Sequence, residues 1–163
     1  TAAFLKSEQD SISAASKTLA AWLPGKIIIA FCEDRYASTA LRLKQQINEN
    51  SKMCCWYNAI PELNHNEIVG WREVHKQLAV LFLRTDDEYS RNTQRLNFTQ
   101  NEVLPYAYNT YEIKAMGSNS LERHFYFIHF GDWLSYHLAT LRDVDVVEVK
   151  VIDGFKAQLS NIP

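Results

Sequence analysis

The chain has 163 residues, of which 47% are apolar, and it contains four Trp, eight Phe and eight Tyr. This composition supplies enough apolar surface for one domain with a core and excludes a disordered chain. The formal charge is −2, and Lys and Arg are scattered along the sequence, so we expect no nucleic-acid partner. No stretch approaches the ~20 apolar residues of a membrane span and no signal peptide is evident, so we expect a cytoplasmic protein without membrane contact.

Three cysteines, Cys32, Cys54 and Cys55, lie within or beside apolar runs and do not form a spaced framework. Their number is odd, which favours a reducing compartment. Adjacent cysteines can be redox-active, but no C-x-x-C spacing and no flanking His accompanies this pair. We therefore interpret all three as small buried hydrophobic residues.

The first half of the chain alternates helical and strand patterns. Apolar residues recur at helical spacing over residues 6–23, and Pro24 and Gly25 end that helix. Residues 26–32 (KIIIAFC) form a continuous β-branched and aromatic run, which is typical of a strand buried on both faces of a parallel sheet. The next predicted elements are a helix over residues 38–47, a strand over 53–57, a short helix over 63–71 and a strand over 78–83.

The second half continues this alternation. It contains predicted helices over residues 86–102 and 121–142, a weaker strand over 108–115, an extended connector over 146–152 and helical turns over 154–159. The helix over 121–142 is apolar around much of its girth, so we expect it to face an interface. Its predicted apolar stripe is Leu121, Phe125, Ile128, Leu134, Leu138 and Leu141. The whole pattern predicts one domain over residues 1–163, a flavodoxin-like, three-layer α/β/α sandwich with a mainly parallel sheet.

Ligands of such sheets tend to bind beyond the carboxyl ends of the strands. There, Ser38 and Thr39 begin a helix whose hydroxyls and N–H groups could contact a sugar or its phosphate. The preceding carboxylates, Glu33 and Asp34, oppose an anion. A simple helix cap is the alternative interpretation of this loop.

The most unusual segment is residues 61–67 (PELNHNE), which combines two carboxylates, two amides and an imidazole directly after a strand. Histidine is the residue that most often transfers protons in enzymes, so His65 could act as acid or base, although a structural or solvated role is the usual one for a single loop His. No second His or Cys lies at a ligand spacing, so we expect no metal. By pattern alone, Glu49 and Lys156 are surface residues on helical turns.

Residues 46–71, QINENSKMCCWYNAIPELNHNEIVGW, carry a resemblance to a known family. They resemble the C-terminal sugar isomerase (SIS) domain of bifunctional phosphoglucose/phosphomannose isomerases, with its elements I-N-E-N-A-K and P-E-x-N-H-N-E-I-V-G-W. Residues 130–149, FGDWLSYHLATLRDVDVVEV, are similar to the closing helix of that family, and the tail through Lys156 is similar to its last helix. The resemblance implies an SIS fold for essentially the whole chain after the first helix.

The resemblance also implies roles for three residues. Glu49 matches the base that moves a proton between C1 and C2 of the sugar. His65 matches a ring-opening histidine supplied by another subunit, and Lys156 matches a lysine tied to ring opening and charge stabilisation. The implied reaction interconverts glucose 6-phosphate or mannose 6-phosphate with fructose 6-phosphate through an enediolate, with no metal or organic cofactor.

The resemblance covers only the second half of such an enzyme. It implies a missing N-terminal SIS domain that grips the phosphate of the hexose 6-phosphate, and a homodimer. The chain also begins at Thr1 rather than Met, which suggests processing or an excised domain. Because phosphate binding positions the reacting carbons, we expect the isolated fragment to be inactive or nearly so. Two alternatives stay open: a non-catalytic SIS module that senses a phosphosugar, and a dimerisation scaffold.

Overall fold

The computed structural model describes residues 1–160 and 162. Four strands are present among them: β1 (Ile27–Glu33), β2 (Cys55–Ile60), β3 (His75–Arg84) and β4 (Ala107–Lys114). The α-helices are α1 (Ala2–Ala20), α2 (Ala37–Ser51), α3 (Ser90–Val103), α4 (Ser120–Leu141) and α5 (Lys150–Leu159). Among the described residues, no helix combines the length and the apolar character that crossing a membrane requires.

The strands form one sheet in the order β2-β1-β3-β4, and every neighbouring pair is parallel. Ile28 of β1 lies between Cys55 of β2 and Ala79 of β3. The sheet explains the continuous apolar run in β1, because a central parallel strand is covered on both faces. The predicted parallel sheet and its central strand are confirmed.

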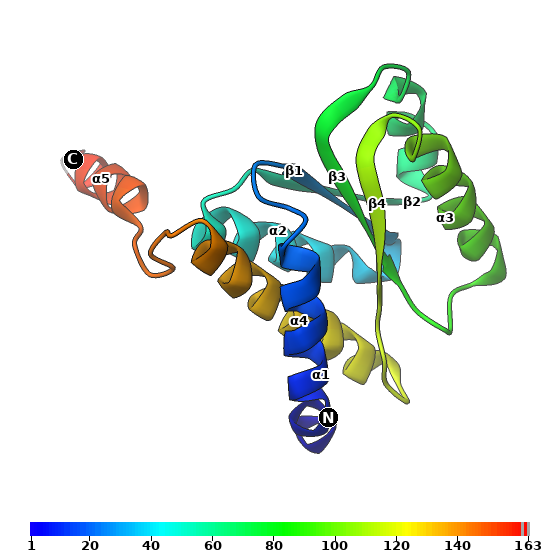
Figure 1. Cartoon of the computed structure of the whole chain (residues 1–163), viewed down its shortest axis with the longest axis horizontal. Coiled ribbons are helices and arrows are strands. Elements are labelled where there is room, and N and C mark those ends of the chain that lie inside the picture. The colour runs from blue at the N-terminus through cyan, green and yellow to red at the C-terminus, as the bar shows by residue number, and fades with distance from the viewer. Residues whose placement is uncertain (161, 163) are drawn as a thin grey trace.

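Helices cover both faces of the sheet (Figure 1). The strand residues that share a core with α1, α2 and α4 alternate with those that face α3, as the two-residue period of a strand requires. Ala30 and Cys32 belong to the first core, and Phe31 between them belongs to the second. The three-layer α/β/α sandwich is therefore confirmed.

Several predicted bounds were wrong. The first helix covers Ala2–Ala20 in place of residues 6–23, so Trp22 lies beyond its end and is 57% exposed. The short helix expected over 63–71 consists of two 3₁₀ turns, Glu62–Asn64 and Glu67–Gly70. The extended connector expected over 146–152 ends early, because α5 already begins at Lys150.

The apolar stripe predicted for α4 was only partly right. Leu134 and Leu138 are fully buried, whereas Leu121, Phe125 and Leu141 are exposed. The buried face of α4 consists mainly of Tyr126, Phe127, Phe130, Leu134 and Leu138. A helix with large apolar groups at nearly every angle offers several stripes of similar quality, so periodicity alone could not select the buried one.

The parallel sheet has two different edges. All four strands begin at one edge, here called the amino edge, and end at the other, the carboxyl edge. Helix α2 runs back from the carboxyl edge to the amino edge between β1 and β2, and α5 stands apart from the body of the domain (Figure 1). This geometry decides which candidate residues can meet.

Candidate functional site

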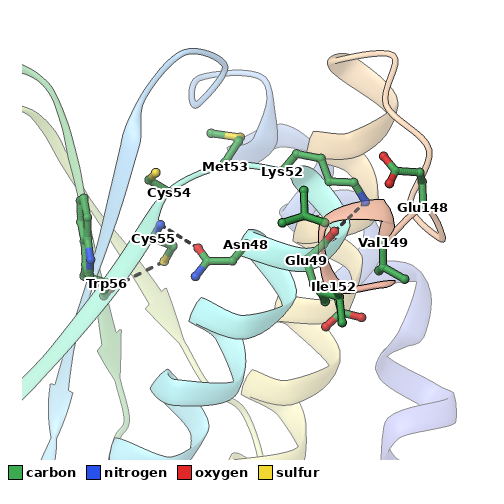
Figure 2. Close-up of a pocket in the computed structure, with 11 residues that line it drawn as sticks. Asn48, Glu49, Lys52, Met53, Cys54, Cys55, Trp56, Glu148, Val149 and Ile152 are labelled. Carbon is green, nitrogen blue, oxygen red and sulfur yellow. Dashed lines mark hydrogen bonds between the residues drawn. The ribbon is translucent and has the colours of Figure 1, made fainter. Parts of the chain in front are cut away.

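Glu49 lies on the last turn of α2 at the amino edge, where it lines a pocket of about 430 Å³. The walls come from the end of α2, the start of β2 and the segment that leads into α5 (Figure 2). Most of the lining is apolar, and its polar side chains are those of Asn48, Glu49, Lys52 and Glu148. Pockets with apolar walls and a few polar groups are the usual form of a small-molecule site.

The chain turns sharply directly after Glu49. Helix α2 ends because Lys52 adopts the left-handed conformation, with a φ of 55°, and the amide of Met53 donates to the carbonyl of Ile47. The ammonium of Lys52 curls back and donates to the carbonyl oxygen of Glu49 at 2.7 Å (Figure 2). A cation therefore lies beside the candidate base.

Two carboxylates line this pocket, and they differ in their hydrogen bonds. Glu148 accepts a hydrogen bond from the backbone N–H of Lys150 at the start of α5. The carboxylate of Glu49 is exposed and has no hydrogen-bond partner among the residues that the structure describes. Of the two, Glu49 is the carboxylate that is available to a ligand.

Lys156 lies on α5 and is exposed. It does not line the pocket, but Ile152, four residues earlier, does. Residues four apart on a helix lie on the same face, about 6 Å from one another. Lys156 is thus about one helical turn beyond the wall of the pocket that contains Glu49.

His65 lies at the other edge of the sheet. It follows β2, whereas Glu49 precedes it, and at about 3.3 Å per residue the strand from Cys55 to Ile60 spans roughly 17 Å. The imidazole is exposed, and no hydrogen bond of the ring exists among the described residues. One chain therefore does not bring His65 and Glu49 together.

The polar neighbours of His65 hold the loop in place. Asn64 donates to Thr99 at 2.7 Å, Asn66 donates to Glu62 at 2.8 Å and Asn58 donates to Glu67 at 2.7 Å. Each of these side chains is engaged within the loop or with a neighbouring element, and the remaining side-chain oxygen of Asn64 is buried. Of the unusual segment 61–67, the imidazole is the side chain that remains available.

Ser38 and Thr39 lie in the first turn of α2, at the carboxyl edge and at the opposite end of that helix from Glu49. Ten residues of helix separate Thr39 from Glu49, which corresponds to about 15 Å along the axis. The side chain of Ser38 is exposed, whereas Thr39 is only 4% exposed. Ser38 is therefore the better placed of the two for a ligand.

Charged side chains cluster at the carboxyl edge beside the start of α2. Glu33 is 3% exposed and pairs with Arg35 at 2.7 Å, and Arg35 pairs in turn with Asp87 at 2.9 Å. Arg123 also pairs with Asp87, at 3.1 Å. Partial burial alone would raise the pKa of Asp87, but hydrogen bonds from Thr85 and Arg35 lower that pKa below its usual value. Glu33, Arg35 and Asp87 line a pocket of about 390 Å³ at this edge, where the topology would place a ligand.

The cysteines divide into two kinds. Cys32 and Cys55 are buried as expected, and burial raises the pKa of each thiol to about 12. Cys54 is exposed and lines the pocket with Glu49, so its expected burial was wrong. Among residues 1–160 and 162, no group of three His, Cys, Asp or Glu side chains is arranged to hold a metal ion.

Sequence reasoning missed two parts of this pocket. Lys52 fell between the helix predicted over 38–47 and the strand predicted over 53–57 and was given no role, and Glu148 fell within the expected extended connector. The position of Lys52 directly after a helix end was the available signal. For Glu148 no local signal existed, because only the tertiary fold brings residue 148 next to residue 49.

Solved structures of other proteins share this fold. A glucose-6-phosphate isomerase like protein from Thermus thermophilus superposes with a TM-score of 0.65 at 18% identity, over 80% of this chain and 42% of that one. Glucosamine-6-phosphate deaminase from Thermotoga maritima superposes with a TM-score of 0.62 at 11% identity, over 86% of this chain and 44% of that one. At such identities the likeness concerns the fold alone.

Sequence comparison defines the family. The sequence model described as the bacterial phospho-glucose isomerase C-terminal SIS domain matches residues 12–159. The bifunctional phosphoglucose/phosphomannose isomerase of Thermoplasma acidophilum is 35% identical, over 83% of this chain and 43% of the relative. That of Aquifex aeolicus is 31% identical, over 95% of this chain and 49% of the relative. The chain belongs to the family of bacterial phospho-glucose isomerase C-terminal SIS domains, and it spans about half the length of these curated relatives.

Proposed function

We propose that this chain forms the C-terminal half of an aldose–ketose isomerase that interconverts glucose 6-phosphate or mannose 6-phosphate with fructose 6-phosphate. The observation that carries the proposal is the position of Glu49, whose unbonded carboxylate lines an apolar pocket next to a cation. The relatives over most of this chain are named bifunctional phosphoglucose/phosphomannose isomerases, which supports the same reaction here.

In the proposed reaction Glu49 takes the proton from C2 of the open-chain aldose. The electron pair left at C2 forms the C1–C2 double bond of an enediolate, and the carbonyl oxygen at C1 accepts the negative charge. Transfer of the hydroxyl proton from O2 to O1, together with return of the proton from Glu49 to C1, gives the ketose. A general base contributes about 10²–10⁴-fold to such proton transfer. Lys156 supplies positive charge near the oxygens of the enediolate.

We propose that the remaining groups come from outside this chain. The separation of His65 from Glu49 by the length of β2 favours a second subunit as the source of the ring-opening histidine in each site, and hence a homodimer. A second SIS domain, corresponding to the half of the relatives that this chain does not span, supplies most of the phosphate grip. Ser38, exposed at the start of α2, is retained as a substrate contact, and the burial of Thr39 argues for a supporting role of that residue.

Glu49→Gln in the full-length protein tests the proposal. The amide keeps the shape of the side chain and removes its basicity, so turnover of fructose 6-phosphate should fall by at least about 10²-fold while binding is retained. Exchange of the transferred C1 proton of fructose 6-phosphate with solvent should fall by about the same factor. Glu148→Gln is the matched control, because it changes the other carboxylate of the same pocket and should leave turnover nearly unchanged.

Two outcomes would reverse the proposal. If Glu49→Gln turns over at the parent rate, or if Glu148→Gln is the inactive variant, Glu49 is not the base. If the full-length parent binds fructose 6-phosphate but exchanges none of its C1 protons with solvent, the chain is part of a non-catalytic phosphosugar sensor. Isotope exchange distinguishes the sensor from an enzyme with a different base.

A further inference from the structure

The turn that carries Glu49 is tied to α4 by three of its neighbours. Asn50 donates from its side-chain amide to the hydroxyl of Ser135 at 2.9 Å, and the hydroxyl of Ser51 donates to the carbonyl of Ser135 at 2.9 Å. Arg142, at the end of α4, donates to the carbonyl of Lys52 at 2.9 Å and also to that of Ser51. Residues 50, 51 and 52 are therefore all held by α4.

These contacts lie in a closely packed part of the domain. Ser51 and Ser135 are fully buried. One helical turn before Ser135, a Cβ on Gly131 would lie 2.9 Å from the terminal carbon of Leu43 on α2, so the two helices approach closely there. A buried hydroxyl without a partner costs about 1–3 kcal/mol, which favours the single arrangement in which both serines are bonded.

The other side of the turn is tied to the sheet. The side-chain oxygen of Asn48 accepts a hydrogen bond from the amide of Cys55 at 2.9 Å, at the first residue of β2 (Figure 2). Glu49 thus stands between Asn48, which is fixed to β2, and Asn50, which is fixed to α4. The carboxylate itself stays unbonded in the pocket.

We infer that Ser135 and Arg142 are positioning residues, which hold the backbone of Glu49 at the orientation that proton transfer requires. The inference rests on the proposed function of Glu49. Neither side chain lines the pocket, so each acts through the turn and not on the substrate. We call the hydrogen bonds that Ser135 and Arg142 form with residues 50–52 the clamp. A misplacement of about 1 Å at a reacting group can cost about 10²-fold in rate, so loss of the clamp should slow the reaction.

A purely structural role, stabilisation of the end of α2, is the alternative interpretation of Arg142. An arginine that donates to the last carbonyls of a helix stabilises that helix end wherever it occurs. The structure contains a matched control for this role, because Arg42 also crosses from α2 to α4, where it pairs with Asp132 at 3.1 Å. Arg42 lies about two helical turns before Glu49 and does not touch its turn.

The test uses the full-length protein and four variants: Arg142→Ala, Arg142→Lys, Ser135→Ala and the control Arg42→Ala. Arg142→Ala and Ser135→Ala should lower kcat for fructose 6-phosphate about 10-fold and leave KM within about twofold, because substrate binding does not use the clamp. The isotope effect on kcat with substrate deuterated at the transferred position should increase, since proton transfer becomes slower. Arg142→Lys should restore part of kcat, and Arg42→Ala should match the parent.

Amide hydrogen exchange gives a second measurement that does not depend on activity. The amides of Met53 and Cys55 are hydrogen-bonded within this turn, and they should exchange faster in Arg142→Ala than in Arg42→Ala. Unchanged exchange of these amides in Arg142→Ala would show that Arg142 does not hold the turn in place. Faster exchange with an unchanged kcat and isotope effect overturns its role in positioning. A full-length parent that shows no isomerase activity, yet shows the exchange difference, overturns the proposed function while supporting the clamp.

Discussion

Burial decides how much the charged side chains Glu33 and Arg42 each contribute to the stability of the domain. Glu33 is 3% exposed and accepts hydrogen bonds from Arg35 and from the side chain of Asn92 at 2.9 Å. The pair between Arg42 and Asp132 joins two helices at a similar distance, but both side chains are more than one-third exposed. Solvent therefore screens the pair between Arg42 and Asp132, whereas the buried carboxylate of Glu33 is shielded from solvent.

We predict that Glu33→Ala lowers the free energy of unfolding by about 2–3 kcal/mol, because it removes a buried carboxylate that accepts charge-assisted hydrogen bonds. Arg42→Ala should cost under about 1 kcal/mol. Urea unfolding of both variants measures these values. Equal effects of the two substitutions would show that the buried network at the carboxyl edge does not support the fold.

His137 links α4 to α1 and makes the stability of the domain depend on pH. Its ring lies 3.3 Å from the hydroxyl of Ser13 and stacks on Trp133. Partial burial lowers the pKa of His137 below its usual value and the charge of Lys17 acts in the same direction, against the hydrogen bond with Ser13.

The folded state therefore favours the neutral ring of His137. Its contribution to stability is complete above the unfolded pKa of about 6.5 and is lost as the pH falls through the lower folded pKa. We predict that the parent loses more stability than His137→Gln when the pH is lowered below about 6.5. Thermal unfolding at several pH values measures the difference, and parallel curves for the two proteins would contradict it.

At the scale of elements, α5 differs from the other helices because none of its residues is buried. Ile152, Phe155 and Leu159 nevertheless recur at helical spacing on one face, and Lys156 lies among them. The contribution of α5 to the stability of the domain should be small, whereas the proposed function needs its lysine.

Ending the chain after Val149 separates these two effects. The isolated domain should keep its free energy of unfolding within about 0.5 kcal/mol, because the deletion removes no buried side chain described in the structure. The same deletion in the full-length protein should abolish isomerase activity, since it removes Lys156. A large loss of stability in the isolated domain would show that α5 supports the fold directly.

At the scale of the whole molecule, the length of β2 between Glu49 and His65 motivates the proposed homodimer. A mixed dimer of the full-length protein tests it, with Glu49→Gln in one chain and His65→Ala in the other. If each site combines Glu49 of one chain with His65 of the other, both defects fall into one site and the second site is intact. About half of the parent activity per mixed dimer should then return, provided that the sites work independently.

The alternative assembly gives a different result. If His65 served the site of its own chain, each site of the mixed dimer would contain one defect and no activity would return. Homodimers of each single variant are the controls, and both should be inactive.

The sequence by itself determined the three-layer architecture. The uninterrupted apolar run of β1 and the alternation of strand and helix patterns require a parallel sheet that is covered on both faces. It also determined where the polar segment around His65 lies, directly after β2, because strand ends and polar loops are local features. The roles of Glu49, His65 and Lys156 came from the family resemblance and remain proposals.

Only the tertiary structure decided which of these residues share a site. Periodicity describes one element at a time, so it could not choose the buried face of α4 or show that residue 148 reaches residue 49. The general rule for parallel sheets directed attention to the carboxyl edge, where the ion pairs around Glu33 line a pocket of about 390 Å³ that does not contain Glu49. The pocket with Glu49 lies at the amino edge instead, because contacts between distant segments, the clamp from α4 among them, place a helix end there.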